Sequence, residues 1–382
     1  MEYIERQITK IIHKAAEYFP VICITGPRQS GKSTLIRHEF QNHLRFSMED
    51  YNIRELAKSD PISFLNQTKD GMVLDEIQRL PMLLSYIQGI VDEHPDRKFI
   101  ISGSSDFTLM RGISQSLAGR VGVFDLLPMS YKEMAELWSH KTIDGILFGG
   151  MYPAVCAEKN TPDLYYPSYT RTYIDRDIRE LVNVSNISQF HIFLKLCAAR
   201  IGSIFNASEL ANEVGVSANT INSWLTILET SYIVIRLQPW SENSRKRLIK
   251  SPKIYFCDTG LACYLLGIES AEQLARDKMR GHLFENFIVM EQLKSRLNNG
   301  KTGNAYFFRD SNGNEIDLLV NNGGELDAYE IKSSMTFSTS FNAVLQKSDT
   351  LLTTKTRDKT VIYTGDFENR DGDIKLLNWR NL

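Results

Sequence analysis

The sequence has no excess of charge of either sign and no long apolar run. It carries 44 Lys and Arg against 46 Asp and Glu, so the formal net charge is −2. This balance excludes a global attraction to nucleic acid, and any contact with DNA must come from a local basic patch. No uncharged apolar stretch approaches the roughly 20 residues that span a bilayer. The charged start, residues 1–6, lacks the apolar core of a signal peptide. We therefore expect a soluble, cytoplasmic protein that makes no membrane contact.

Cysteine is scarce and unpatterned. The five cysteines are odd in number and form no C-x-x-C pair, which argues against a disulfide framework or a zinc site and for reduced core residues. Internal repeats, coiled-coil heptads and low-complexity segments are also missing. At 382 residues and 42% hydrophobic content, the chain is long enough for two or three domains with their own cores.

A glycine-rich segment with the spacing G-x-x-x-x-G-K-S lies between an apolar run at residues 21–24 and a helical pattern that begins at Thr34. Such a loop is typical of phosphate binding, because its glycines let backbone N–H groups approach phosphate oxygens at the positive end of the helix dipole. Lys32 is expected to reach the β- and γ-phosphates, and the Ser33 hydroxyl to complete the shell of a Mg²⁺ ion. The predicted binding residues are Gly26, Pro27, Arg28, Gln29, Ser30, Gly31, Lys32, Ser33 and Thr34. The sequence therefore predicts a site for ATP or GTP.

A second apolar run, residues 72–74, ends in Asp75 and Glu76. This is the form of a Walker B strand, which is buried on both faces until its carboxyl end meets the ligand. We expect Asp75 to hold Mg²⁺ through water, and Glu76 to orient or deprotonate the attacking water. The alternative is the end of a buried strand with two surface acids.

Two further features belong to the same expected α/β domain. The run at residues 99–102 predicts another parallel strand, and Ser104 just after it is the predicted sensor of the γ-phosphate, with simple turn chemistry as the competing explanation. Arg120 precedes a strand expected at residues 121–127 and is a candidate arginine finger that acts in trans on a neighbour's nucleotide. A surface salt bridge is the alternative for Arg120. The other candidate sensors are Ser102 and Ser105.

These motifs resemble those of prokaryotic AAA+-type ATPases that carry a domain of unknown function, numbered 4143, at the C-terminus. The resemblance also covers residues 172–177, residues 258–261 and the block near Glu330. It implies an AAA+-like P-loop fold, which we place at residues 1–129, and ATP rather than GTP as the nucleotide. It assigns no biological role. The helical pattern over residues 130–188 fits an α-helical lid.

The middle of the chain has helix-turn-helix spacing. Ala211 is small where two helices are expected to touch, Gly215 stands at the turn, and Ser217 is placed to cap the second helix. A strand expected at residues 232–237 begins a wing, so we predict a winged helix over residues 189–255. The second helix is polar but carries no Lys or Arg. Five basic residues and one acid follow it, which gives a local net charge of five minus one, or +4. They contact a nucleic-acid backbone or lie in a solvated loop or interdomain module. These basic residues are Arg245, Lys246, Arg247, Lys250 and Lys253, against Glu242.

The last third, residues 256–382, contains acids and a lysine in an ordered set. Asp317 lies in a predicted hairpin strand, and Glu330 and Lys332 are two residues apart on another strand, so they share a face. The set resembles the PD-(D/E)XK nuclease superfamily, and its order resembles that of archaeal Holliday junction resolvases. The resemblance implies that Asp317 and Glu330 hold one or two Mg²⁺ ions, that Lys332 orients the attacking water, and that Glu285 is a further ligand or anchors the metal waters.

Two functions from different classes follow. The first is an ATPase whose nucleotide state controls a metal-dependent DNA endonuclease in the C-terminal domain. The second is a nucleotide-switched signalling or defence protein whose nuclease-like domain binds a partner without cleaving. The intact acid–acid–lysine set favours the first, and the uncharged recognition helix favours the second. A homo-oligomer is expected if Arg120 acts as a finger.

Overall fold

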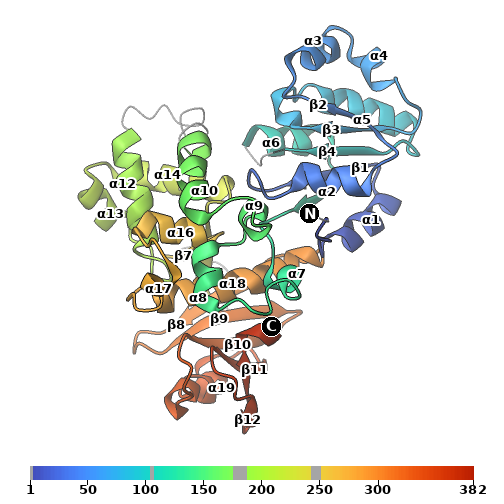
Figure 1. Ribbon diagram of the computed structural model, residues 1–382. Coiled ribbons are helices and arrows are strands. Elements are labelled where there is room, and N and C mark those ends of the chain that lie inside the picture. The colour runs from blue at the N-terminus through green and yellow to red at the C-terminus, as the bar shows by residue number, and fades with distance from the viewer. Residues whose placement is uncertain (1–2, 104–106, 175–186, 242–250) are drawn as a thin grey trace. The chain divides into compact units, whose positions relative to one another are not determined.

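The computed structural model describes residues 3–103, 107–174, 187–241 and 251–382, which divide into two compact units (Figure 1). The first unit is Met1–Met129 together with two short segments, Thr230–Tyr232 and Arg296–Lys301. The second unit takes the remainder, from Ser130 onward. Among the described residues, no helix has both the length and the apolar character needed to cross a membrane.

A five-stranded sheet forms the centre of the first unit, in the order β2-β3-β4-β1-β5. Every neighbouring pair is parallel, so the carboxyl ends of all five strands lie at one edge. Apolar runs in the sequence predicted β1, β3, β4 and β5, and the structure confirms these four strands. Their bounds are β1 (Val21–Thr25), β2 (Leu44–Ser47), β3 (Met72–Asp75), β4 (Phe99–Ser102) and β5 (Val121–Asp125).

The central strand β1 is buried on both faces because its side chains alternate between two cores. Val21 and Cys23 belong to the core that includes residues of α4, α5 and α6. Ile22 and Ile24 belong to the opposite core, with residues of α1 and α2. The helices are α1 (Thr9–Tyr18), α2 (Lys32–Glu39), α3 (Tyr51–Ser59), α4 (Pro61–Leu65), α5 (Leu83–Glu93) and α6 (Phe107–Ser116), with a 3₁₀ turn at Ile77–Arg79.

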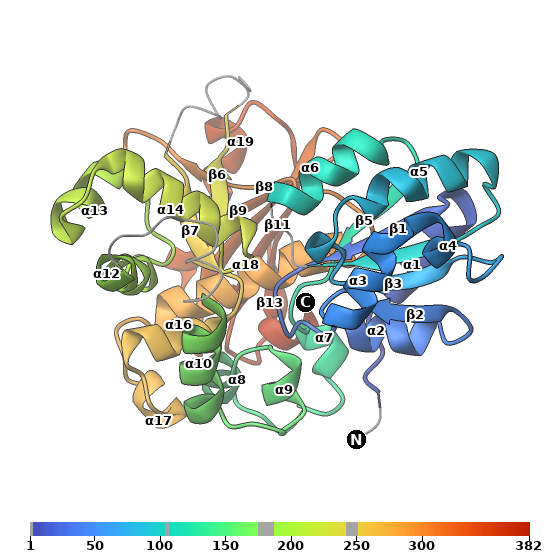
Figure 2. The same ribbon diagram turned by 90° about the horizontal axis from the view of Figure 1, so that it is seen from above.

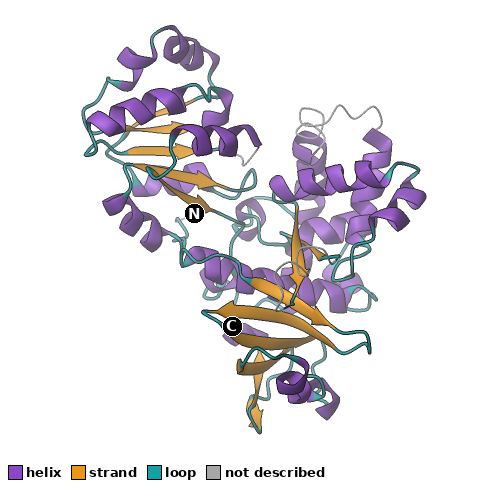
Figure 3. Ribbon diagram, turned by 180° about the vertical axis from the view of Figure 1, so that it is seen from behind, coloured by secondary structure: helices purple, strands orange, loops and turns teal. Residues whose placement is uncertain are grey.

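An eight-stranded sheet forms the base of the second unit, in the order β12-β13-β11-β10-β9-β8-β6-β7 (orange strands in Figure 3). Strands β8 and β9 form the predicted antiparallel hairpin, and β10 pairs with β9. The predicted wing strand β6 is continuous with this sheet, because it pairs with β8. The bounds are β6 (Val234–Pro239), β7 (Lys253–Phe256), β8 (Ala305–Arg309), β9 (Glu315–Asn322), β10 (Glu325–Lys332), β11 (Thr356–Tyr363), β12 (Asn369–Asp371) and β13 (Ile374–Asn378).

Helices make up the rest of the second unit, with α12, α13 and α14 gathered in one group (Figure 2). The predicted lid segment is helical, but its described part belongs to the second unit, where α8 and α10 pack against α16. The sequence could not reveal this, because helical periodicity does not identify the surface that a helix covers. The helices are α7 (Tyr131–Met134), α8 (Ile143–Gly149), α9 (Pro153–Cys156), α10 (Pro162–Tyr169), α12 (Ile187–Ala198), α13 (Ala207–Val214), α14 (Ala218–Thr230), α16 (Thr259–Leu266), α17 (Ala271–Leu274), α18 (Arg280–Asn298) and α19 (Ser348–Leu351).

Buried carboxylates bind backbone N–H groups within this helical part. The carboxylate of Asp258 caps α16 through the amide of Leu261, 2.9 Å away, and also accepts from the Met151 amide at 2.6 Å and the Tyr166 hydroxyl at 2.7 Å. Burial raises the pKa of Asp258 although these hydrogen bonds oppose the shift. Position 260 requires glycine, because a Cβ there would lie 2.3 Å from the Tyr166 hydroxyl oxygen. This geometry explains the residues 258–261 singled out in the sequence.

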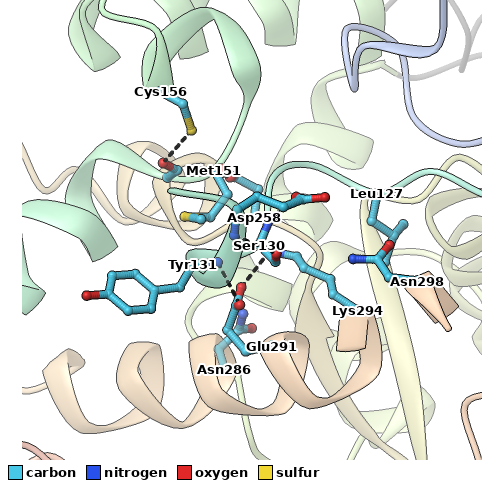
Figure 4. Close-up of polar contacts among 12 residues, drawn as sticks. Leu127, Ser130, Tyr131, Met151, Cys156, Asp258, Asn286, Glu291, Lys294 and Asn298 are labelled. Atoms are coloured by element: carbon cyan, nitrogen blue, oxygen red, sulfur yellow. Dashed lines mark hydrogen bonds and ion pairs between the residues drawn. The ribbon is translucent and has the colours of Figure 1, made fainter. Parts of the chain in front are cut away.

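Glu291 of α18 makes a second such contact (Figure 4). Its carboxylate accepts from the backbone amide of Tyr131 at 2.7 Å and from the ammonium of Lys294 at 3.0 Å. Both side chains are buried, so the ion pair and the amide together compensate the loss of hydration. The contact fixes the start of α7 against α18.

Replacement of Asp258 by alanine should destabilise the protein markedly. The substitution removes a helix cap, leaves the buried Met151 amide without a partner and leaves the Tyr166 hydroxyl with the Gly149 carbonyl alone, 3.0 Å away. The expected loss is about 2–4 kcal/mol. The matched control is Asn206→Ala, which removes an exposed cap from α13 in the same unit and should cost about 1 kcal/mol. The midpoints of thermal unfolding compare the two variants, and equal losses would contradict the assigned role of Asp258.

Candidate nucleotide site and acid–lysine cluster

The predicted phosphate loop connects β1 to α2 with a backbone that glycine permits. Gly26, Gln29 and Gly31 have φ values of 142°, 62° and 98°, in the left-handed region that most residues avoid. A Cβ on Gly26 would lie 2.2 Å from the carbonyl oxygen of Leu126, so no larger residue fits there. The loop therefore passes directly against the chain that leaves β5.

Lys32 is the first residue of α2, and no side chain caps this helix. Its Nζ donates to the carbonyl oxygens of Gly26 and Pro27, both 2.9 Å away, so the lysine folds back across the loop. Burial lowers the pKa of Lys32 to about 8, while the nearby carboxylates of Glu76 and Asp75 oppose this shift. The uncapped N–H groups and the partly desolvated ammonium form a site suited to an anion.

The other residues of the predicted loop differ in how deeply their side chains are buried. Ser30 is fully buried, and its Oγ has no hydrogen-bond partner, as expected of a group positioned for a ligand. Ser33 is half-buried and Thr34 is exposed. Arg6, which the sequence analysis missed, lies buried beneath the loop and donates to the carbonyl oxygens of Ser30 at 2.9 Å and Leu127 at 2.7 Å. No motif in the sequence marks Arg6.

The predicted Walker B acids lie at the same edge of the sheet as the loop, because β3 and β1 run parallel on either side of β4. The Ser102 hydroxyl at the end of β4 donates to the carboxylate of Asp75. Glu76 has φ of 55° and accepts a hydrogen bond from the side-chain amide of Gln78. The predicted sensor Ser104 and its alternative Ser105 lie outside the described residues, whereas Ser102 directly contacts the Walker B acid.

Arg120 lies at the opposite edge of the same sheet. It precedes β5, whose carboxyl end is the one near the loop, and its guanidinium forms a bidentate pair with Asp92 at 2.5 and 2.8 Å. Arg120 therefore does not reach the phosphate loop of its own chain. The finger role remains a prediction that requires a second copy of the chain.

The acids and lysine predicted in the C-terminal third converge at β9 and β10. The Nζ of Lys332 lies 2.5 Å from Glu330 Oε1 and 3.6 Å from Asp317 Oδ2, and the Ile331 amide donates to Asp317 Oδ2 at 2.8 Å. Burial, followed by the nearby charge of Asp317, raises the pKa of Glu330 to about 8, against the effect of Lys332. The second oxygen of Glu330, Oε2, is buried without a hydrogen-bond partner. This half of the cluster thus keeps an open acceptor.

Glu285 joins the cluster from α18, but its carboxylate already has partners. Its Oε1 accepts from the Tyr255 hydroxyl at 2.6 Å and from the Lys253 ammonium at 3.3 Å. Burial, followed by the charge of Asp317, raises the pKa of Glu285 to about 7. Burial alone would lower the pKa of Lys253, but Glu285 and Glu315 outweigh it and raise the value. We define Lys253, Tyr255, Glu285, Glu315, Asp317, Glu330 and Lys332 as the acid–lysine cluster.

In the parts of the chain that the structure describes, no three His, Cys, Asp or Glu side chains are grouped so as to hold a metal ion. The metal roles of Glu285, Asp317 and Glu330 therefore stay predictions. The unpartnered Oε2 of Glu330 fits a cation held by Asp317 and Glu330, whereas Oε1 of Glu285 already accepts from an ammonium and a phenol.

The structure has the two helices and the glycine turn of the predicted helix-turn-helix, α13 and α14. One of the predicted basic residues is buried. Gly215 adopts φ of 77° between α13 and α14, and the Ser217 hydroxyl accepts from the amide of Thr220. The sequence left five basic residues either in contact with nucleic acid or in a solvated loop or interdomain module. Of these, Lys253 is buried and paired with carboxylates, which excludes it from a solvent-facing patch. The other four fall in residues 242–250, outside the described residues. The winged helix and its DNA contact stay predictions.

The chain is similar to several families and proteins. A model described as an AAA domain matches residues 18–135, and models of two domains of unknown function, DUF8612 and DUF4143, match residues 139–272 and 280–382. The uncharacterized proteins Rv2008c of Mycobacterium tuberculosis and Mb2031c of Mycobacterium bovis are each 31% identical over 343 residues, which cover 87% of this chain and 74% of theirs.

A solved structure is also similar. The Walker-type ATPase PABY2304 of Pyrococcus abyssi shares 15% identity with a TM-score of 0.49, and the match covers 69% of this chain and 96% of that one. The phosphate loop lies inside the AAA match, and the acid–lysine cluster draws Glu285, Asp317, Glu330 and Lys332 from the DUF4143 match. The chain therefore belongs to the same family as the mycobacterial proteins, and it combines a P-loop AAA domain with a C-terminal DUF4143 domain.

Proposed function

We propose that this protein binds ATP with Mg²⁺ at residues 26–34 and hydrolyses it. The observation that carries the proposal is the position of Lys32, which lies at the uncapped start of α2 close enough to Asp75 and Glu76 for their charges to affect its pKa. In this proposal the loop amides and Lys32 bind the phosphates, and Glu76 orients the attacking water. Ser33 and Asp75 would hold the Mg²⁺ ion, which neutralises charge on the phosphates when bound.

The fold-back of Lys32 supports this assignment physically. Its two acceptors are backbone carbonyl oxygens, which compensate a buried ammonium only in part, so the pKa of Lys32 falls to about 8. A polyphosphate carries far more negative charge and would form a stronger partner for the same ammonium. We propose that the lysine exchanges the carbonyls for phosphate oxygens when ATP binds.

For the C-terminal part we propose metal-dependent cleavage of a phosphodiester in DNA as a second candidate activity. It is favoured by one observation, which is that Asp317, Glu330 and Lys332 meet on adjacent strands with one buried carboxylate oxygen left open. Such a set suits a hard cation beside a lysine that steadies developing charge. A nucleotide-controlled module that binds a partner without cleaving is the competing function.

Lys32→Ala should abolish ATP turnover. The variant loses the side chain that contacts the transferring phosphoryl group, so turnover should fall by about 10²-fold or more. Lys58→Ala, an exposed lysine on α3, is the matched control and should turn over ATP at the natural rate. Phosphate release by purified protein is the measurement, and undiminished turnover in Lys32→Ala would refute the assignment of the loop.

ATP affinity should weaken as the pH rises above about 8. The pKa of Lys32 in the nucleotide-free protein is about 8, and phosphates favour its charged form, so binding at higher pH requires uptake of a proton. Below that pH the lysine is already protonated and the affinity should be level. Dissociation constants measured between about pH 7.5 and 9.5 test this linkage. In Lys32→Arg, which stays charged, the decline should disappear, and its persistence there would assign it to another group.

Asp317→Asn and Lys332→Met should each abolish any DNA cleavage that the natural chain shows with Mg²⁺ or Mn²⁺. Asp317→Asn removes a carboxylate charge with little change in shape, and Lys332→Met removes the ammonium while retaining the stem. Asp358→Asn, exposed on β11, is the control. Cleavage of duplex, branched and single-stranded DNA is followed with and without ATP. If the natural protein cuts none of these, the non-cleaving module is supported instead.

A further inference from the structure

Lys253 is a buried cation beside Glu285, which the sequence predicted as a further metal ligand or an anchor of the metal waters. Its residue is 2% exposed, at the start of the edge strand β7. The Nζ lies 2.6 Å from Glu315 Oε1, 3.3 Å from Glu285 Oε1, and 5.4 Å from the centre of the Phe307 ring. A buried ammonium is stable only with such partners, because loss of its hydration is costly.

The two acids around Lys253 come from different elements. Glu285 lies on α18, and Glu315 lies on β9, two residues before Asp317. Tyr255, two residues after Lys253 on β7, donates its hydroxyl to the same Oε1 of Glu285. One helix and one strand thus each bring a carboxylate to the ammonium of β7, and Glu285 receives hydrogen bonds from two side chains of β7.

The half of the cluster that contains Asp317, Glu330 and Lys332 differs in two ways: its lysine is more exposed, and one of its carboxylate oxygens has no hydrogen-bond partner. The side chain of Lys332 is 34% exposed, against 3% for Lys253, so Lys332 can move into solvent while Lys253 cannot. Glu330 Oε2 is buried without a partner, whereas Glu285 Oε1 has two. A divalent ion can therefore enter beside Asp317 and Glu330, but must displace a buried lysine to reach Glu285 Oε1.

We propose that Lys253 is a built-in cation that occupies the position between Glu285 and Glu315. Glu285 is then a positioning residue for Lys253 and not a metal ligand, and the cluster accepts a divalent ion only at Asp317 and Glu330. This inference deepens the second proposed activity and rests on it, but its test measures metal binding and does not require cleavage. Lys253 cannot withdraw into solvent as Lys332 can, so a divalent ion between Glu285 and Glu315 would lie against its ammonium, and the two charges repel strongly in a buried site.

The test counts Mn²⁺ ions bound to the full-length, nucleotide-free protein by electron paramagnetic resonance. Lys253→Met keeps an unbranched side chain of similar length and removes the charge, so it should bind one more Mn²⁺ ion than the natural chain. The double variant with Glu285→Gln should lose that additional ion. Glu285→Gln alone, which can still accept from Tyr255 and Lys253, should bind as many ions as the natural chain.

Two results would overturn the proposal. The first is a lower Mn²⁺ count in Glu285→Gln alone, which would make Glu285 a metal ligand in the presence of Lys253. The second is a folded Lys253→Met protein that gains no ion. Thermal unfolding with and without Mn²⁺ checks folding, and the ion should raise the midpoint of Lys253→Met more than that of the natural chain. Should Lys253→Met not fold, the comparison of Glu285→Gln with the natural chain still decides.

A third variant separates this inference from the proposed cleavage. Asp317→Asn with Glu330→Gln should remove the ion of the natural chain, if it binds one. A natural chain that binds no Mn²⁺ at the cluster would contradict the proposed cleavage, while a gain in Lys253→Met would still support the role of Lys253.

Discussion

The close approach of the loop after β1 to the chain after β5 is the constraint on which the nucleotide site depends. Gly26 lies so near the Leu126 carbonyl that even a methyl group would collide with it. The loop then continues into α2, whose first residue is Lys32. Arg6 supports both segments from beneath through the carbonyls of Ser30 and Leu127. The geometry is thus set by backbone contacts more than by the side chains that face the ligand.

The parallel sheet supplies the second requirement. Because β1, β3 and β4 run in the same direction, the loop, the Walker B acids and Ser102 meet at one edge, although they are about 25–75 residues apart in the sequence. Buried strands with apolar residues on both faces make this arrangement stable, and polar residues are confined to the strand ends. The same rule places Arg120 at the far edge, where it pairs with Asp92.

Much of the first unit could be predicted from the sequence, because apolar runs and a glycine motif report local geometry directly. The strands, the loop and the hairpin of β8 and β9 followed from such patterns. What could not be predicted depends on contacts between distant segments. Arg6 carries no motif, the helices after residue 130 give no sign of the surface they cover, and Lys253 looked like one of several exposed basic residues. Its burial against Glu285 and Glu315 follows only from the pairing of β6, β7 and β8.

The central claim is that main-chain amides and the Lys32 ammonium at the start of α2 bind the phosphates of ATP. Hydrogen–deuterium exchange of the natural chain, with and without Mg²⁺ and ATP, tests it most directly. The account predicts that nucleotide slows exchange at residues 26–34 and around Asp75 and Glu76. Unchanged exchange in these segments at saturating nucleotide would contradict it.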